Sequence, residues 1–297
     1  MSTAPLSPQR LRVVATLAGA GTLALEMLAP RLLAPAFGTS QPIWAAVIGM
    51  TLLYLAAGYH LGGRWADRTA DIGDLVSRVL LWAGVAAAFI APVAPPLISA
   101  ARGALQAVAV GSFVGALVIA LVLFAAPIML LAAVSPLLSR LALVDSEPAH
   151  VGRTLGQLSM YATVGSLVGT FATALWLIPS LGTTLSLLAV SAVLIGLSAW
   201  VTGQTRRALW ALLVVGLVLW RLVAGPPALA AGCRACSVVS TIESANNTIQ
   251  IATRAHPVHG QQTLLLLNEG MAVHSVANAD GLVSGAAADL LTDGGPW

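Results

Sequence analysis

The chain has 297 residues, of which 58% are hydrophobic and 8% are charged, and its mean hydropathy is +0.90. Soluble domains carry about 25% charged residues, so this composition excludes a soluble globular protein and predicts a mainly α-helical, polytopic membrane protein. The net charge of +3 rests on arginine, because the sequence contains no lysine, and no basic run with interleaved aromatic residues indicates nucleic-acid binding.

The N-terminal stretch places Arg10 and Arg12 ahead of an apolar run, as a signal peptide would. A signal peptide has an apolar region of about 7–15 residues followed by a cleavage site of small residues. Here the run is longer, and Arg31 stands where the cleavage site would fall. We therefore expect a retained first membrane span.

Seven stretches reach the length of about 20 apolar residues that a membrane-spanning helix needs. They are residues 11–37, 42–63, 76–98, 104–139, 154–179, 183–203 and 207–224. The fourth stretch is too long for a simple span and too short for two spans with a comfortable loop. Because Pro127 and Pro136 lie inside it and proline kinks helices, we expect one long kinked helix.

The arginines predict the orientation of these spans, since cytoplasmic loops carry an excess of basic residues. With seven spans and a cytoplasmic N-terminus, nine arginines fall on the cytoplasmic side, and Arg102 falls in an outside loop. The nine are Arg10, Arg12, Arg64, Arg68, Arg78, Arg140, Arg153, Arg206 and Arg207. We expect a multi-pass inner-membrane protein whose chain after Ala224 is extracytoplasmic.

The last part of the chain differs in character, which predicts two domains: a helical bundle over residues 1–224 and a small β-rich segment over residues 225–297. Polar, β-prone stretches alternate there with turn residues. Cys233 and Cys236 form a lone CxxC pair without further ligands spaced for zinc. We expect spare thiols or a local disulfide there, and no metal or cofactor.

The intramembrane polar candidates of the first two spans are Glu26, Arg31 and His60, and ionisable residues within a span usually face a bundle interior or a water-filled cavity. Glu26 lies near the middle of its span and is a candidate contact for a proton or cation, with a structural hydrogen bond as the alternative. Arg31 lies nearer the outer end, about 140° from Glu26 around a helix of 3.6 residues per turn. His60 favours a structural role near the inner end of the second span.

The second span ends in the sequence GGRWADR, whose glycines, Gly62 and Gly63, allow close helix packing. Asp67 is placed to accept hydrogen bonds from Arg64 or Arg68 at the cytoplasmic interface. A simple stop-transfer anchor is the alternative interpretation. The small-residue patterns at 111–116 and 165–169 predict packing faces, and no internal repeat is discernible in the sequence.

Several stretches together resemble the membrane half of bacterial spermidine synthase-like proteins, also described as fused transporter/spermidine synthase proteins. They are EMLAPRLLAPAFGTSQPIW, GYHLGGRWADR, SPLLSRL, YATVGSLVGT and IPSLG. The GGRWADR element also resembles the cytoplasmic loop between the second and third helices of major facilitator transporters. The stretches TIESANNTIQI and LLLLNEGMAVHSVANADGLVSGAAADLL are similar to the N-terminal β-rich segment of aminopropyltransferases.

The resemblance implies a Rossmann-like domain after the β-rich segment, holding the decarboxylated S-adenosylmethionine donor. The given sequence ends at Trp297, where that domain would begin, so we expect no donor site in this chain. The family's Tyr-Gln pair is Asn246-Asn247 here, and its glutamine after LNEG is Met271. The resemblance thus implies a degenerate ligand segment.

Three hypotheses for function follow. The favoured one is a non-catalytic membrane protein, either transporter-like or a scaffold subunit, whose partners are the bilayer and another membrane protein. The second is the membrane half of an enzyme that a separate Rossmann domain completes. The third is a transporter of a small solute or polyamine, with Glu26 as the cation contact.

Overall fold

The computed structural model describes most of the helical region and four strands near the C-terminus. The described residues are 7–37, 41–105, 111–144, 150–203, 209, 216, 220, 236–243, 248–257, 260–267 and 272–278. The chain divides into two compact units, one comprising residues 1–177 and 183–220 and the other residues 178–182 and 221–297. Each unit is described by itself below.

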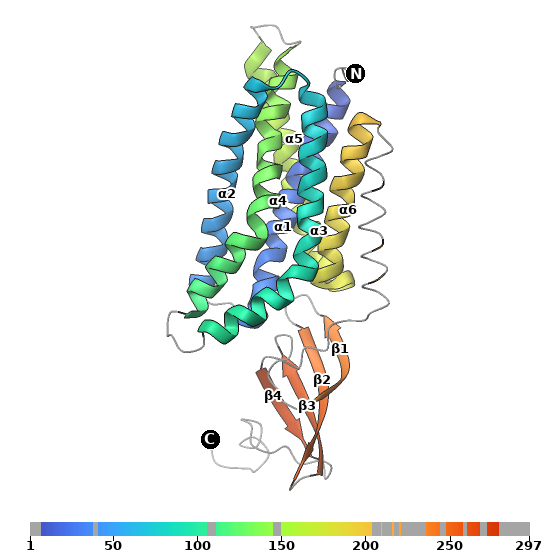
Figure 1. The fold of residues 1–297 in the computed structure, drawn as a ribbon. Coiled ribbons are helices and arrows are strands. Elements are labelled where there is room, and N and C mark those ends of the chain that lie inside the picture. The colour runs from blue at the N-terminus through green and yellow to red at the C-terminus, as the bar shows by residue number, and fades with distance from the viewer. Residues whose placement is uncertain are drawn as a thin grey trace, which may run out of the picture. The chain divides into compact units, whose positions relative to one another are not determined.

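The helical unit consists of long apolar helices (Figure 1). They are α1 (Pro8–Phe37), α2 (Gln41–Arg68), α3 (Ile72–Leu105), α4 (Gly111–Val144), α5 (Val151–Ala172), the π-helical turn η2 (Thr173–Leu177) and α6 (Ile178–Thr202). Apolar stretches form helices in a bilayer because a helix satisfies its backbone hydrogen bonds internally. The prediction of one helix rather than two across Pro127 and Pro136 is confirmed. Its expected bounds, 104–139, are wrong, because α3 continues to Leu105 and α4 covers Gly111–Val144.

The expected count of seven spans is not supported. Five described helical segments are long and apolar enough to cross a membrane: Pro8–Ala34, Gln41–Arg68, Ile72–Ile98, Leu117–Val144 and Val151–Thr202. The last segment covers two of the expected spans in 52 residues, and α5 and α6 run in opposite directions within it (Figure 1). Gly182 interrupts it with a φ of 75°, which favours glycine. Apart from three single residues, the expected span 207–224 lies outside the described residues.

The third helix agrees with the expected span, since its apolar segment is Ile72–Ile98, and it corrects the expected end of the helix. It was expected over 76–98, but α3 extends to Leu105 and contains Pro92, Pro95 and Pro96. Arg102 therefore belongs to a helix and not to a loop. Membrane helices tolerate interior proline because neighbouring groups satisfy the freed backbone carbonyls, and the expected span already included these prolines. The prediction ended before Arg102 because it assigned that arginine to a loop.

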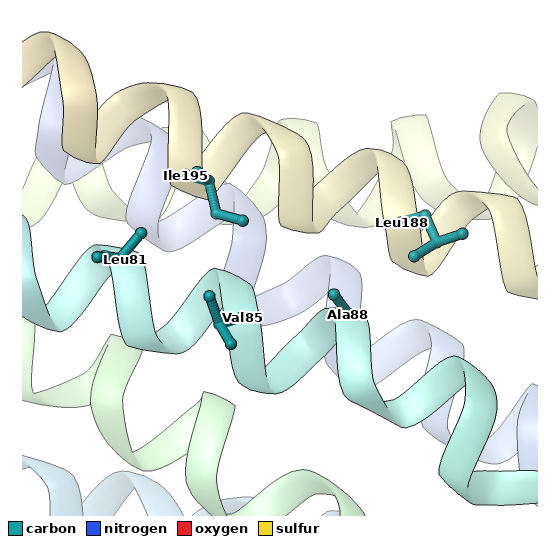
Figure 2. Close-up of a cluster of buried hydrophobic side chains, with 5 residues drawn as sticks. All are labelled: Leu81, Val85, Ala88, Leu188 and Ile195. Carbon is teal, nitrogen blue, oxygen red and sulfur yellow. The ribbon is translucent and has the colours of Figure 1, made fainter. Parts of the chain in front are cut away.

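Helices α1 and α4 lie at the centre of the helical unit. Helix α2 packs on α4, α5 packs on α1, and α3 also packs on α4. Helix α6 packs along α3 through buried aliphatic side chains (Figure 2). Successive helices alternate in direction in Figure 1, and the most extensive packing, of α2 on α4 and of α5 on α1, joins helices that are distant in sequence.

Glycines bring the backbones of two helix pairs into contact. A Cβ built at Gly58 of α2 would collide with the carbonyl oxygen of Met129 in α4, and one at Gly165 of α5 with that of Thr16 in α1. Gly169 meets the α1 backbone at Ala20 in the same way. The predicted packing face at 165–169 is confirmed, and these glycines act as small residues do at other membrane helix interfaces.

Seven of the nine arginines in the described helices gather at one end of the helical unit, the exceptions being Arg31 and Arg102. Arg10 lies over the Trp200 ring at 5.3 Å, and Arg12 over the Tyr161 ring at 5.5 Å. The alternation of helix directions brings the other terminal arginines to this same end, which we call the arginine end (Figure 1). They are Arg64, Arg68, Arg78, Arg140 and Arg153.

The second unit contains the small sheet that the C-terminal sequence predicts. Strands β1 (Ser237–Glu243), β2 (Thr248–His256), β3 (Gly260–Leu267) and β4 (Ala272–Ala277) form an antiparallel meander. One face is buried and includes Ala252, Leu264, Leu266 and Val276. Alternation of buried and exposed positions along β3 is what a sheet with one covered face requires.

Candidate functional site

A cavity of about 140 Å³ lies within the helical unit between α1, α2, α4 and α5. We call it the hydroxyl pocket. Its lining comprises Ala15, Ala18, Gly19, Thr22, Leu23, Leu55, Tyr59, Leu131, Ala132, Val134, Ser135, Leu138, Ser139, Leu158, Ser159, Ala162 and Ser166. Liquid water occupies about 30 Å³ per molecule, so the pocket is large enough for a molecule of a few heavy atoms.

Small side chains create this space. Gly19 approaches α5 so closely that a Cβ there would collide with the carbonyl oxygen of Ala162. Ala15, Ala18 and Ala132 add little bulk to the central helices. Two backbones can therefore come together at Gly19 while the neighbouring positions leave a hollow.

Hydroxyl groups are the polar chemistry of the pocket. Thr22 donates to the carbonyl oxygen of Ala18 at 2.9 Å, and Ser166 donates to that of Gly19 at 3.2 Å. Each hydroxyl that donates in this way keeps its lone pairs as acceptors. The lining hydroxyls belong to Thr22, Tyr59, Ser135, Ser139, Ser159 and Ser166.

The lining contains no carboxylate, imidazole, ammonium or guanidinium group among its described residues. General acid–base catalysis near neutral pH usually relies on such groups. Binding through neutral hydrogen bonds is the chemistry that these residues offer, and an apolar or small-residue wall around few polar groups is typical of a ligand site.

The three intramembrane residues predicted from the sequence are not part of this lining. Glu26 and Arg31 are half-buried on α1, and His60 is exposed on α2. The lining on α1 runs from Ala15 to Leu23 and stops short of Glu26. The structure therefore places the candidate carboxylate on the helix that forms the pocket, but outside the pocket itself.

The GGRWADR element ends α2 at the arginine end. Gly62 is buried, and a Cβ there would lie 2.7 Å from Pro136 Cγ, whereas Gly63 meets nothing within 4 Å. Arg64, Asp67 and Arg68 are exposed. Among the described side chains of residues 41–98, the ion pair found is Arg78 Nε with Asp74 Oδ2 at 3.0 Å rather than one involving Asp67.

The predicted sites in the C-terminal part fall largely outside the described residues. This holds for Cys233, Asn246, Asn247 and Met271. Cys236 is disulfide-bonded. Across the described ranges, no group of three or more histidine, cysteine or acidic side chains is placed to hold a metal ion.

The hydroxyl pocket itself was missed by the sequence reasoning. Its hydroxyl residues are scattered over three helices and Tyr59 of a fourth, so their convergence depends on which helices pack together. The usable signal was the presence of Thr22, Ser135 and Ser166 in otherwise apolar spans. Comparison of the chain with protein-family models, curated proteins and solved structures gives no match.

Proposed function

We propose that this chain is a non-catalytic, transporter-like membrane protein whose helical unit binds a small neutral polar solute in the hydroxyl pocket. The observation that supports this most is the pocket lining, which offers six hydroxyl groups and no charged side chain. Hydroxyls can donate to and accept from a polyol or amide, and the small volume restricts the site to compact molecules.

The lining favours a neutral solute over a polyamine. A polyamine is cationic at neutral pH, and its burial requires compensating negative charge. Glu26 is the carboxylate nearest in sequence to the lining of α1, but it is not one of the lining residues. The spermidine synthase-like resemblance therefore suggests a relationship of the membrane part, and we do not extend it to a polyamine substrate.

The orientation proposed for the bundle places the arginine end in the cytoplasm. Seven arginines of the described helices lie at that end, and the positive-inside rule assigns such an end to the cytoplasmic face. The outward faces of the helices carry exposed apolar side chains such as Trp82, Phe89 and Leu167, which suits contact with lipid.

Glycerol flux into proteoliposomes tests the proposed function. Vesicles containing the full chain are expected to take up glycerol faster than protein-free vesicles. Ser135→Val is expected to reduce this flux, because it removes a lining hydroxyl and narrows the pocket. Thr163→Val is the matched control, since Thr163 is exposed on α5 and outside the lining.

Two results would contradict the proposal. One is glycerol flux equal to that of protein-free vesicles. The other is saturable putrescine uptake that Ser135→Val leaves unchanged and Glu26→Gln abolishes, which would favour the polyamine hypothesis.

A further inference from the structure

The packing of the six helices repeats itself when the first three are exchanged with the last three. Helix α2 packs on α4, and α5 packs on α1. Helices α1 and α4 pack on each other, as α3 and α6 do. If α1, α2 and α3 are exchanged with α4, α5 and α6, the contact of α2 with α4 becomes that of α5 with α1. The contacts of α1 with α4 and of α3 with α6 are unchanged by the exchange.

Individual residues follow the same exchange. Gly165 lies 107 positions after Gly58, and Met129 lies 113 positions after Thr16. Gly58 meets the carbonyl oxygen of Met129, while Gly165 meets the carbonyl oxygen of Thr16. A glycine of each second helix thus packs on the matching carbonyl of the opposite first helix.

The next turn repeats this relation with the same offsets. Gly62 meets the backbone of Ala133, and Gly169 meets the backbone of Ala20. Gly169 again lies 107 positions after Gly62, and Ala133 lies 113 positions after Ala20. Two independent contacts on each side therefore obey one correspondence.

The seam between α3 and α6 obeys it too. Figure 2 shows Leu81 near Ile195 and Ala88 facing Leu188. Leu188 lies 107 positions after Leu81, and Ile195 lies 107 positions after Ala88. The pair of Leu81 with Ile195 therefore corresponds to the pair of Leu188 with Ala88. A Cβ at Gly84 would lie 3.0 Å from the carbonyl oxygen of Ser191, its own counterpart at the same offset.

A residue that packs against its own counterpart marks a two-fold axis. Gly84 lies 12 residues into α3, about 18 Å from the arginine end at 1.5 Å per residue. Gly19 and its counterpart Ala132 lie at about the same depth by the same measure. Because each half has three helices, the halves run in opposite directions, and such inverted repeats are related by an axis in the membrane plane.

The hydroxyl pocket lies on this axis. Ten of its lining residues form five pairs of counterparts at the offsets found above. The pairs are Ala18 with Leu131, Gly19 with Ala132, Thr22 with Ser135, Leu55 with Ala162 and Tyr59 with Ser166. Binding sites of transporters built from inverted repeats lie at this interface near the bilayer midplane.

The rest of the lining breaks the symmetry. Ala15 and Leu138 line the pocket toward the arginine end. Their counterparts, Ile128 and Leu25, are both 0% exposed and do not line it. The pocket therefore extends toward the arginine end and is packed shut toward the opposite end.

We propose that α1–α3 and α4–α6 are inverted repeats that open the hydroxyl pocket alternately to the two ends of the bundle, and that Glu26 lines the pocket in the alternate conformation. Ser139 lines the extension at the arginine end, and Glu26 is its counterpart on α1. In the alternate conformation the open end of the pocket is therefore lined by the carboxylate of Glu26, where in the present conformation it is lined by the hydroxyl of Ser139. This inference rests on the proposed solute-binding role. It adds a site for a proton or cation at Glu26, toward the end of the bundle opposite the arginine end, where Arg31 also lies.

Thiol accessibility in proteoliposomes tests this inference with the full-length chain. Single Ser139→Cys and Glu26→Cys variants are labelled by a membrane-impermeant thiosulfonate reagent from either side, with the unsubstituted chain as background. We expect Ser139→Cys to react from the arginine end and Glu26→Cys from the opposite end. Adding Ser159→Trp fills the extension at the arginine end and is expected to raise the rate at Glu26→Cys by about threefold or more, by shifting the conformational population.

Thr163→Trp is the matched control, because it adds the same side chain on the same helix outside the lining and leaves both rates unchanged. Leu158→Trp is a second filled variant if Ser159→Trp does not yield a monodisperse protein. The inference is overturned if both cysteines react from the same side, or if neither filled variant changes the Glu26→Cys rate. Glycerol flux without alternating accessibility would retain the proposed function and reject this inference. Alternating accessibility without glycerol flux would reject glycerol-like solutes as the proposed ligand and retain the inverted repeats.

Discussion

Ser77 and Ser198 each donate a hydrogen bond from the side-chain hydroxyl to the backbone carbonyl oxygen of the other, at 2.7 Å and 2.6 Å. Both residues are fully buried, one on α3 and one on α6. Hydrogen bonds between membrane helices stabilise by about 0.6 kcal/mol on average and up to about 1.7. This reciprocal pair fixes the register of the two helices near the arginine end.

Replacing both serines is expected to weaken the seam. In a double-mutant cycle of Ser77→Ala and Ser198→Ala, we expect a coupling free energy of about 1 kcal/mol, measured by unfolding in mixed detergent micelles. Thr163→Ala, which removes an exposed hydroxyl bonded within its own helix to the Ser159 carbonyl oxygen, is the control. Strictly additive effects of the two alanines would show that the pair is not coupled.

Glycine substitutions on α5 are expected to have opposite effects according to position. Gly165→Ala places a methyl group on the backbone of Thr16 and forces α1 and α5 apart, so we expect a loss of about 2 kcal/mol or more in the free energy of unfolding. Gly156→Ala on the same helix meets nothing within 4 Å and is expected to be neutral or to stabilise by up to about 1 kcal/mol. Equal thermal stability of the two variants would contradict the close contact.

The same comparison is available on α2. Gly58→Ala is expected to lower thermal stability because the new methyl group meets the backbone of Met129, whereas Gly49→Ala has open space around it. Under the correspondence between the two halves, Gly58→Ala and Gly165→Ala should lower the melting temperature by similar amounts. A large effect at one glycine and none at the other would show that the halves do not pack equivalently.

Reporter fusions are expected to reveal the orientation of the bundle. Alkaline phosphatase joined after Leu105 should be active, because α3 ends opposite the arginine end, and the same fusion after Gly203 should be inactive. A fluorescent cytoplasmic reporter should give the inverse pattern at both sites. A fusion after Ala224 then tests whether the chain crosses the membrane again. Inactive alkaline phosphatase at that site would contradict the prediction that the chain after Ala224 is extracytoplasmic.

A buried polar pair is expected to stabilise the sheet. Gln262 Nε2 donates to Asn278 Oδ1 at 2.7 Å, and Arg254 Nε donates to Gln262 Oε1 at 2.8 Å. Gln262→Ala leaves both partners short of a hydrogen bond and should cost about 1–3 kcal/mol, seen as faster hydrogen exchange in β2 and β3 of the full chain. The adjacent, exposed Gln261→Ala is the control, and equal exchange in the two variants would refute the prediction.

Composition and periodicity predicted those features that depend on single segments. The lengths of the apolar stretches predicted membrane-spanning helices, and the prolines inside one uninterrupted apolar stretch predicted a single fourth helix. The β-prone stretches between turn residues predicted the sheet. The glycines at 165–169 also indicated a packing face before its partner was known. Each of these properties depends on the residues of one short contiguous segment.

Features that depend on pairs of distant segments were not predicted. The hydroxyl pocket needs Thr22 and Ser135 on two helices that sequence alone does not bring together. The repeat is equally hidden, because matching positions such as Gly58 and Gly165 share a size requirement while their neighbours differ. Hydropathy constrains the outside of a helix to be apolar and leaves its choice of partner open.

The contact between Gly58 and Met129 also constrains how the protein is made. The surface of α2 that carries Gly58 packs on α4, so it has no native partner until Met129 has been synthesised, 71 positions later. At about 5–20 residues per second, several seconds pass between the synthesis of Gly58 and that of Met129. Helix α2 therefore reaches its native packing only after the second half of the chain has supplied α4.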